Sequence, residues 1–168
     1  MHTFQPFPIS TVEINPFKLI GQQWAAITAE KDGKFNSMTA AWGGMGVLWN
    51  KNVATIYVRD SRYTKEFLDG GDKFSVTFFD DSFKPALKYL GAVSGRNEDK
   101  LAGARLHINK DLDVPFIDEG NFVLICRKMA AVPITADHFT DPTIDDNFYK
   151  DGDYHTMYIG EILDLLAR

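Results

Sequence analysis

The chain has 168 residues, 45% of them hydrophobic and 24% charged, values typical of a globular protein with one core. Its formal net charge of −5 argues against a duplex-binding domain, since such domains usually carry a basic surface. No apolar run could span a bilayer, and the first residues lack the pattern of a signal peptide. We therefore expect one domain over residues 1–168, in the cytoplasm, with no membrane or nucleic-acid partner.

Segments that alternate with a period of two, or are continuously apolar, recur along the chain and predict strands. They are expected over residues 19–30, 35–42, 53–59, 74–79, 121–132 and 155–163. Asp32-Gly33 predicts a tight turn between the first two, whereas the glycine-rich residues 43–52 indicate a connection. Residues 1–17 contain three prolines among aromatic residues, so they should pack on the body without a regular helix or central strand.

Short helices are expected between the strands, over residues 62–68, 83–92 and 97–102. Ser61 is the expected N-cap of the first helix, and Gly70-Gly71 should end it. Strands recur without a regular strand–helix–strand alternation. The pattern therefore favours a mainly β fold, an antiparallel barrel or sandwich with peripheral short helices, over a doubly wound sheet.

Neither a metal site nor a covalent nucleophile is the preferred interpretation. The four histidines are scattered, and the acidic residues 141–153 lack the spacing of an EF-hand, so we interpret this stretch as a solvated loop. The single cysteine, Cys126, excludes an internal disulfide and lies in an apolar strand, where it should act as a small hydrophobe. Residues 43–46 do not open a helix in a βαβ unit and are interpreted as a tight loop.

Residues 36–64 carry the strongest chemical signal. They combine small residues that let a ligand approach the backbone, hydroxyls and guanidinium groups suited to a phosphate, and indoles with flat apolar faces. These side chains belong to Thr39, Trp42, Trp49, Thr55, Arg59, Ser61, Arg62 and Thr64. They indicate a phosphorylated, planar ligand. The open alternative is that the hydroxyls are ordinary strand residues, the arginines surface charges and the tryptophans core.

Four blocks resemble, in the same order, motifs of the flavin reductase-like, or flavoredoxin, family. Residues 36–46 resemble its N-x-M-T-x-x-W-G-G-x-G pattern, and residues 58–67 resemble its V-R-P-x-R-Y-T-x-E-F block. Residues 94–100 resemble S-G-R-x-x-D-K, and residues 153–162 resemble D-Y-H-x-x-Y-I-G-E-I. One departure is Asp60, which stands where proline is common in the family. An acid there is unfavourable for a phosphate unless it points away and caps the following helix.

The resemblance implies a Greek-key split β-barrel that binds FMN and forms a homodimer, with the flavin near the subunit interface. It places the flavin along Met38, Thr39, Ala40, Ala41 and Trp42, and the ribityl phosphate among Thr55, Arg59, Ser61, Arg62 and Thr64. Lys100, with Ser94 and Gly95, would reach the phosphate or the ring from a second loop, and Lys100 is the candidate for stabilising the reduced flavin. His155 is the candidate catalytic residue, near the flavin or the dimer contact.

The activity that the resemblance implies is that of an FMN-binding oxidoreductase. Electrons would pass from NADH, NADPH or another carrier through the flavin to an acceptor, so no side-chain nucleophile is required. Two alternatives stay open: a non-catalytic FMN-binding electron-transfer protein without a nicotinamide site, and a split barrel that binds another small ligand.

Overall fold

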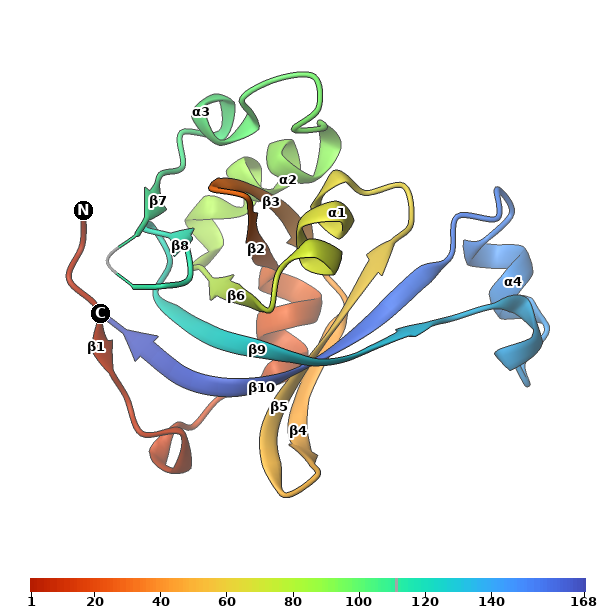
Figure 1. The fold of residues 1–168 in the computed structure, drawn as a ribbon, viewed down its shortest axis with the longest axis horizontal. Helices are drawn as coiled ribbons and strands as arrows, with labels where there is room; N and C mark the ends of the chain where they lie inside the picture. The colour runs from red at the N-terminus through yellow and green to blue at the C-terminus, as the bar shows by residue number, and fades with distance from the viewer. Residues whose placement is uncertain (111) are drawn as a thin grey trace.

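A strongly curved antiparallel sheet forms the body of the protein in the computed structural model, which describes residues 1–110 and 112–168 (Figure 1). Its strands lie in the order β3-β2-β6-β9-β10-β5-β4, with β1 paired to β10, and β7 pairs with β8 in a second, small sheet. The strands are β1 Gln5–Pro6, β2 Ala25–Lys31, β3 Lys34–Ala40, β4 Gly43–Leu48, β5 Lys51–Arg59, β6 Lys73–Phe78, β7 Ile108–Asn109, β8 Phe116–Ile117, β9 Phe122–Pro133 and β10 His155–Ala167.

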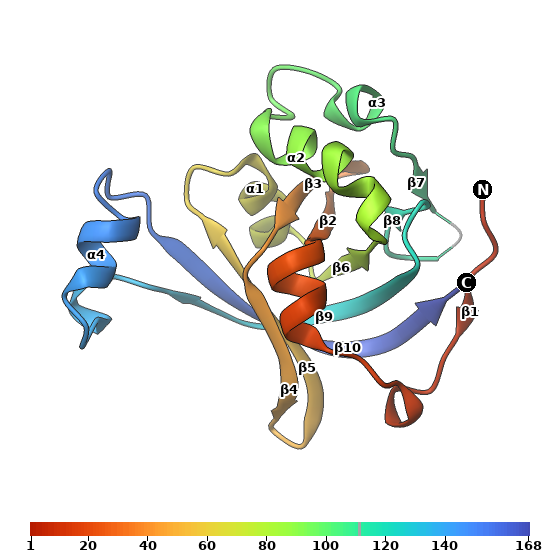
Figure 2. The same cartoon turned by 180° about the vertical axis from the view of Figure 1, so that it is seen from behind.

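Short helices surround this sheet, so the expected mainly β fold with peripheral helices is confirmed. The α-helices are α1 Tyr63–Gly70, α2 Lys84–Ala92, α3 Lys100–Ala104 and α4 Thr143–Phe148, with helical turns at Ile9–Thr11, Phe17–Gln23, Asp81–Phe83 and Ala136–His138. Figures 1 and 2 show α1, α2 and α3 gathered on one side of the sheet, whereas α4 lies at the end of an arm built by β9 and β10. None of the described helices has the length and apolar character needed to cross a bilayer.

The two edge strands of the sheet are consecutive in the chain. Only Ala41 and Trp42 separate the end of β3 from the start of β4, and a chain of that length spans at most ~11 Å. The sheet therefore curls until its two edges approach each other at these residues. This seam is where the candidate site described below lies.

The prediction of a connection over residues 43–52 is wrong, because Gly43–Leu48 is a strand paired with β5. A Cβ on Gly43 would lie 2.9 Å from the carbonyl oxygen of Thr55, so glycine is what lets these backbones lie so close. Trp49 and Asn50, with φ of 53° and 57°, form the tight turn of the hairpin. Trp49 is exposed at this tip and is part of neither the core nor the site.

Three smaller expectations are also corrected. The first strand begins at Ala25 because Phe17–Gln23 form a π-helical turn. The acidic stretch is not a plain loop, since Thr143–Phe148 form α4. Ser61 does not cap α1: Arg62 occupies the cap position without a side-chain cap bond. The proline-rich start packs as expected, with Gln5 and Pro6 paired to the end of β10.

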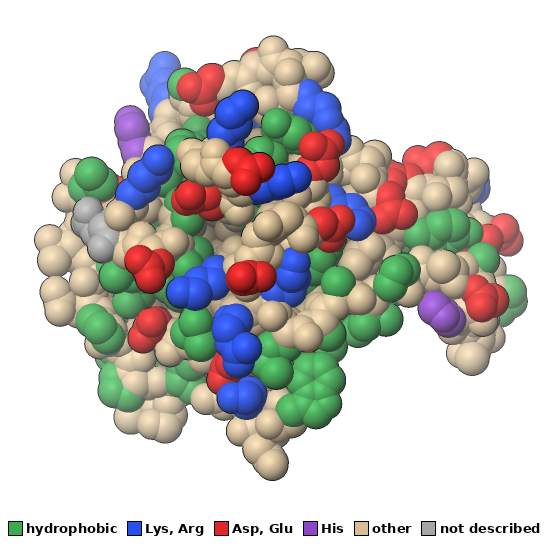
Figure 3. All heavy atoms as spheres, in the orientation of Figure 1, with side chains coloured by type: hydrophobic (Ala, Val, Ile, Leu, Met, Phe, Trp, Pro, Cys, Tyr) green, Lys and Arg blue, Asp and Glu red, His purple; other side chains and the backbone are tan. Residues whose placement is uncertain are grey.

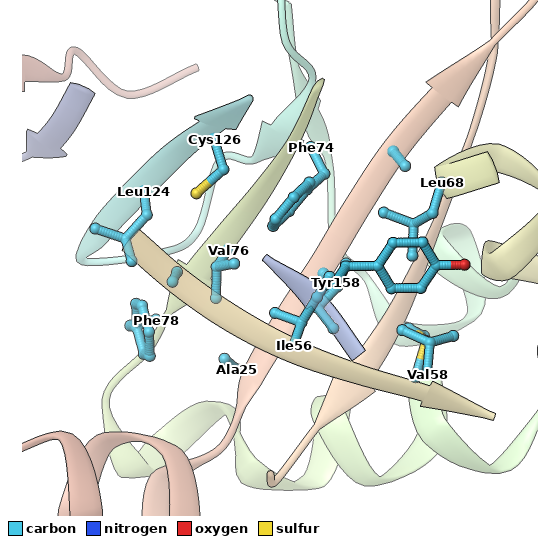
Figure 4. Packing of buried hydrophobic residues seen from close by; sticks show 14 of the residues in the cluster. Ala25, Ile56, Val58, Leu68, Phe74, Val76, Phe78, Leu124, Cys126 and Tyr158 are labelled. Atoms are coloured by element: carbon cyan, nitrogen blue, oxygen red, sulfur yellow. The ribbon is translucent and has the colours of Figure 1, made fainter. Parts of the chain in front are cut away.

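The core fills the inside of the curved sheet. Figure 4 shows side chains from β5, β6, β9 and β10, with Leu68 of α1, converging on one another. Phe74 lies against Gly160, where a Cβ would come within 2.6 Å of the ring. Cys126 is buried here, and desolvation raises the pKa of its thiol, so it packs as a hydrophobe.

Candidate functional site

A cavity of about 310 Å³ lies at the seam between β3 and β4. Its size is that of a small-molecule pocket. Residues 38–42 form one wall, and β5, the start of α1, the end of α2 and the start of β10 supply the rest. The lining residues are Met38, Thr39, Ala40, Ala41, Trp42, Tyr57, Arg59, Arg62, Gly91 and His155. Five consecutive predicted residues thus line a cavity together with Arg59, Arg62 and His155.

A smaller cavity of about 140 Å³ adjoins the first, since Arg62 lines both. Its wall comes from residues on both sides of the start of α1, from the loop after α2 and from the first residue of α3. The lining residues are Ser61, Arg62, Tyr63, Ala92, Val93, Ser94 and Lys100. Hydroxyls and cations therefore converge here from segments 30 or more residues apart in the chain, as the sequence blocks predicted. We call this smaller cavity the cationic pocket.

The two cations of this pocket are poorly solvated and uncompensated. Lys100 is only 3% exposed, and its Nζ donates a long bond, 3.4 Å, to the carbonyl oxygen of Leu90. Desolvation, aided by the charge of Arg62, lowers the pKa of Lys100 to about 8. Desolvation also lowers the pKa of Arg62, partly offset by Asp153, while its Nη1 donates to the carbonyl oxygen of Gly91 at 3.1 Å.

Neither cation has a carboxylate within ion-pair distance in the part of the chain that the structure describes. Asp153 acts on Arg62 only from farther away. A buried ammonium and a half-buried guanidinium without a counter-ion favour the binding of an anion, and the two groups side by side suit a phosphate. The residues present therefore fit a phosphorylated ligand.

Arg59 lines the first cavity and not the cationic pocket. Its Nη1 donates to the carbonyl oxygen of Asp153 at 2.6 Å and its Nη2 to that of Phe148 at 3.1 Å, and its guanidinium lies 5.2 Å from the ring centre of Tyr149. These contacts tie the connection between α4 and β10 to the end of β5. The structure does not bring Arg59 to the cationic pocket, so its predicted contact with a phosphate has no support from this geometry.

A carboxylate that the sequence did not single out lies beside the cationic pocket. The backbone N–H and the hydroxyl of Ser61 donate to the two oxygens of Asp153, at 3.0 and 2.5 Å. Asp60, the residue that departs from the family pattern, lies elsewhere: its Oδ1 is 3.9 Å from Nζ of Lys65, and it lines neither cavity. The acid that competes for a predicted phosphate ligand is thus Asp153.

The remaining predicted residues lie at or behind the walls. The Thr39 hydroxyl donates to the carbonyl oxygen of Leu87 at 2.5 Å, which ties β3 to α2. Thr64 is buried and accepts from the Asn36 side chain at 2.7 Å. Gly95 packs on the same amide, since a Cβ there would lie 2.2 Å from Asn36 Oδ1.

Thr55 lies in the sheet opposite Gly44 and lines neither cavity. Of the predicted residues, Thr55, Thr64 and Gly95 therefore do not line the first cavity or the cationic pocket.

His155 closes the first cavity at the start of β10. It is 7% exposed, its ring centre lies 5.1 Å from that of Trp42, and its Nδ1 is 2.7 Å from Oη of Tyr149. Desolvation and the charge of Arg59 lower the pKa of His155 to about 4, with Asp153 and Asp60 acting in the opposite direction. The imidazole is therefore neutral at physiological pH.

Sequence reasoning missed Tyr57, Gly91, Tyr149 and Asp153. Tyr57 carried a signal, because it alternates with Thr55 and Arg59 on one face of a predicted strand. Gly91 and Tyr149 gave none, because tertiary contacts alone bring them to the seam. In the described part of the chain, no three His, Cys, Asp or Glu side chains come together as a metal ion would require.

A third cavity, of about 580 Å³, shares Ala41, Trp42 and Tyr57 with the first and is mainly apolar. It lies between the π-helical turn, β4 and the arm. Its other lining residues are Pro16, Phe17, Ile20, Gly21, Gly43, Gly44, Met45, Ile134 and Tyr149. Trp42 thus lines both the more polar first cavity and this apolar one.

Comparisons with known proteins agree with this geometry. A model of the flavin reductase like domain matches residues 17–168. The FMN-binding domain of a flavin reductases-like enzyme from Shewanella baltica superposes with a TM-score of 0.71 at 16% identity, covering 98% of this chain and 77% of that chain. Flavoredoxin from Methanosarcina acetivorans gives 0.67 at 24% identity, covering 94% and 75%.

A split barrel domain protein from Shewanella frigidimarina gives a TM-score of 0.68 at 14% identity, covering 87% of this chain and 67% of that chain. These likenesses confirm the predicted split-barrel type of fold. No curated protein is similar enough in sequence to count as a relative.

Proposed function

Since the chain belongs to the flavin reductase like domain family, we propose that it is an FMN-dependent oxidoreductase of the flavin reductase or flavoredoxin type. The family and the FMN-binding structural neighbours support FMN as the cofactor. One observation of the structure carries the proposal. The half-buried Arg62 and the buried Lys100 have no carboxylate partner among the described residues, and they line a pocket that adjoins the cavity of Trp42 and His155. Such a site suits a ligand with a phosphate and a flat ring system.

In this proposal Arg62 and Lys100 hold the phosphate, with Ser94 and, once released from Asp153, Ser61. Residues 38–42 line the flavin with their backbone amides and with one flat face of the Trp42 indole. Thr64 and Gly95 act from behind, because both pack on Asn36 and so fix the loop after α2 against β3. Thr55 shapes the seam through its contact with Gly44.

When bound, FMN supplies the exchange of a hydride or electrons with a nicotinamide or another carrier. The chain itself supplies binding, orientation and charge. Lys100, with a pKa of about 8, is mainly protonated at pH 7 and adds a positive charge near the bound anion. His155 and Trp42 limit the access of water to the cavity, since the buried imidazole packs against the indole.

We also propose that the whole chain acts as one domain, in the cytoplasm, and that it forms a homodimer. Support for the dimer comes from two projecting elements with exposed apolar side chains: Val47 and Trp49 on the β4–β5 hairpin, and Val132 and Phe148 on the arm. Figure 3 shows hydrophobic side chains gathered between the hairpin and the arm, whereas charges of both signs are mixed over the rest of this face. Exposed apolar patches of this kind commonly mark protein contacts.

The proposal is tested by adding FMN to the purified protein and then NADH or NADPH without air. We expect bleaching of the flavin absorbance by at least one of them, and catalytic oxidation of it when an acceptor is present. FMN binding without reduction by either nucleotide would favour a non-catalytic electron-transfer protein. Absence of FMN binding would leave a split barrel for another small ligand and would contradict the proposal.

A further inference from the structure

A tyrosine from the arm makes direct contact with the histidine of the first cavity. Tyr149 follows α4, and its Oη lies 2.7 Å from Nδ1 of His155, with the two rings edge to face and their centres 5.6 Å apart. The Tyr149 ring packs against two other aromatic rings, with its centre 5.5 Å from that of Phe139 and 4.8 Å from that of Tyr154. The hydroxyl therefore has a fixed place against one nitrogen of the imidazole.

The direction of this hydrogen bond follows from the partners of the hydroxyl. Tyr149 is 8% exposed, and within the described residues its Oη contacts no other hydrogen-bond acceptor than His155 Nδ1. A buried O–H that has one acceptor within reach donates to it. Desolvation raises the pKa of Tyr149, so the phenol keeps its proton at physiological pH. Nδ1 is then the acceptor, and a neutral imidazole must carry its proton on Nε2.

The other nitrogen of His155 is open to the cavity. His155 lines the first cavity, and within the described residues its Nε2 makes no hydrogen bond with protein. Fully buried side-chain nitrogen and oxygen atoms of the described residues all have partners, so this unpaired Nε2 must reach accessible space. The accessible space at His155 is the cavity.

Burial, aided by the charge of Arg59, keeps the imidazole neutral. Arg59 from β5 lies over the Tyr149 ring and lowers the pKa of His155, while the carboxylates of Asp153 before β10 and Asp60 after β5 act to raise it. Burial and Arg59 together outweigh the two carboxylates and lower the pKa of His155 to about 4, so the ring carries one proton between pH 5 and pH 8. A ring in this state can donate one hydrogen bond without adding charge.

We propose that Tyr149 is a positioning residue that fixes His155 as the Nε2–H tautomer, and that this N–H donates to an acceptor atom of the ring system bound in the cavity. The identity of that ring system as a flavin rests on the proposed function. The tautomer itself does not, because it is set by the contacts of the protein alone. A neutral donor at this place would hold a carbonyl oxygen or an unprotonated ring nitrogen without repelling a cation nearby.

The tautomer is measurable without FMN, by ¹⁵N–¹H correlation spectra of the histidine rings at pH 7. The signals of His155 are assigned by their loss in His155→Gln. We expect the wild-type protein to show a protonated Nε2 and an unprotonated Nδ1. Tyr149→Phe keeps the aromatic stack but removes the hydroxyl, and should populate both tautomers. Tyr154→Phe is the matched control, since its hydroxyl bonds to Asp145 and its ring stacks on Tyr149, and it should leave the wild-type pattern unchanged.

A protonated Nδ1 or a doubly protonated ring in the wild-type protein at pH 7 would overturn the proposal, even if Tyr149→Phe proved unable to fold. An unchanged tautomer in folded Tyr149→Phe would overturn the positioning role. We expect Tyr149→Phe to lower the affinity for FMN ~2- to 10-fold, the range of one net neutral hydrogen bond. Tyr154→Phe should not change that affinity. Equal affinities of the two variants would refute the donor role. If the protein shows the predicted tautomer but binds no FMN, the proposed function is contradicted and the inference about the tautomer still stands.

Discussion

Replacing Lys100 by methionine should stabilise the FMN-free protein while it weakens FMN binding. The ammonium group is buried without a carboxylate partner, and its pKa is about 8 instead of the ordinary 10.5. At pH 7 the folded protein therefore holds a charge that would be better solvated in the unfolded chain. Methionine has a similar length and no charge, so it removes this penalty and keeps the packing.

The magnitude and the pH dependence follow from the two pKa values. The difference between 10.5 and about 8 corresponds to roughly 3 kcal/mol, and relaxation and water penetration around Lys100 make this an upper limit. Because the folded-state pKa is the lower one, the unfolded chain binds more protons between pH 8 and pH 10.5. The stability of the wild-type protein relative to the variant therefore rises over that interval. We expect Lys100→Met to gain about 1–3 kcal/mol at pH 7 and to lose that gain towards pH 10.5.

Urea unfolding of the FMN-free proteins at a series of pH values measures this difference. Lys88→Met is the matched control, because Lys88 lies exposed on α2 and its replacement should change stability little at any pH. A Lys100→Met variant that is less stable than the wild type at pH 7, or that differs from it by the same amount at every pH, would refute the description of Lys100 as an uncompensated buried cation.

Three further predictions concern the walls of the site. Arg62→Ala should weaken FMN binding by about 1.5–3 kcal/mol in calorimetric titration, the loss expected for a hydrogen bond to a charged group. Arg127→Ala, at an exposed arginine, is the control and should leave FMN binding unchanged. An unchanged dissociation constant in Arg62→Ala would remove Arg62 from the site. Asp153→Asn should strengthen FMN binding, because it removes a negative charge beside the cationic pocket, and weaker binding would show that the carboxylate supports the site instead. Gly95→Ala should lower the free energy of unfolding by about 1–3 kcal/mol in urea, since a Cβ at this position has no room. Gly46→Ala is the control: no atom lies within 4 Å of a Cβ there, so it should cost less than about 1 kcal/mol. Equal costs would contradict the close packing at Gly95.

The fold could be predicted wherever a pattern is local. Alternation located β6, and the Asp32-Gly33 turn joined β2 to β3. Alternation did not predict β4, because glycine is disfavoured in strands by propensity. Glycine is nevertheless required at Gly43, where β5 approaches closely. Periodicity also did not predict α4, because its six residues hold only one apolar i,i+4 pair, Ile144 and Phe148, in an acidic stretch.

The candidate site divides in the same way. Residues 38–42, Arg62, Ser94 and Lys100 lie in compact sequence blocks, and the structure brings them to adjoining cavities. Tyr149 and Asp153 lie behind those walls, in contact with the wall residues His155 and Ser61, and no local sequence pattern predicts such contacts. Contacts between segments about 90 residues apart, such as Ser61 with Asp153, depend on the whole sheet.

The central claim, that Arg62 and Lys100 form the phosphate end of an FMN site, is tested most directly by fluorescence titration of FMN into the wild-type protein and into the Arg62→Ala/Lys100→Met double variant. Riboflavin, which lacks the phosphate, serves as the second ligand. We expect saturable quenching of FMN by the wild type, binding of FMN at least tenfold tighter than binding of riboflavin, and loss of that preference in the double variant. Equal affinity of the wild type for FMN and riboflavin, or an unchanged preference in the double variant, would contradict the account.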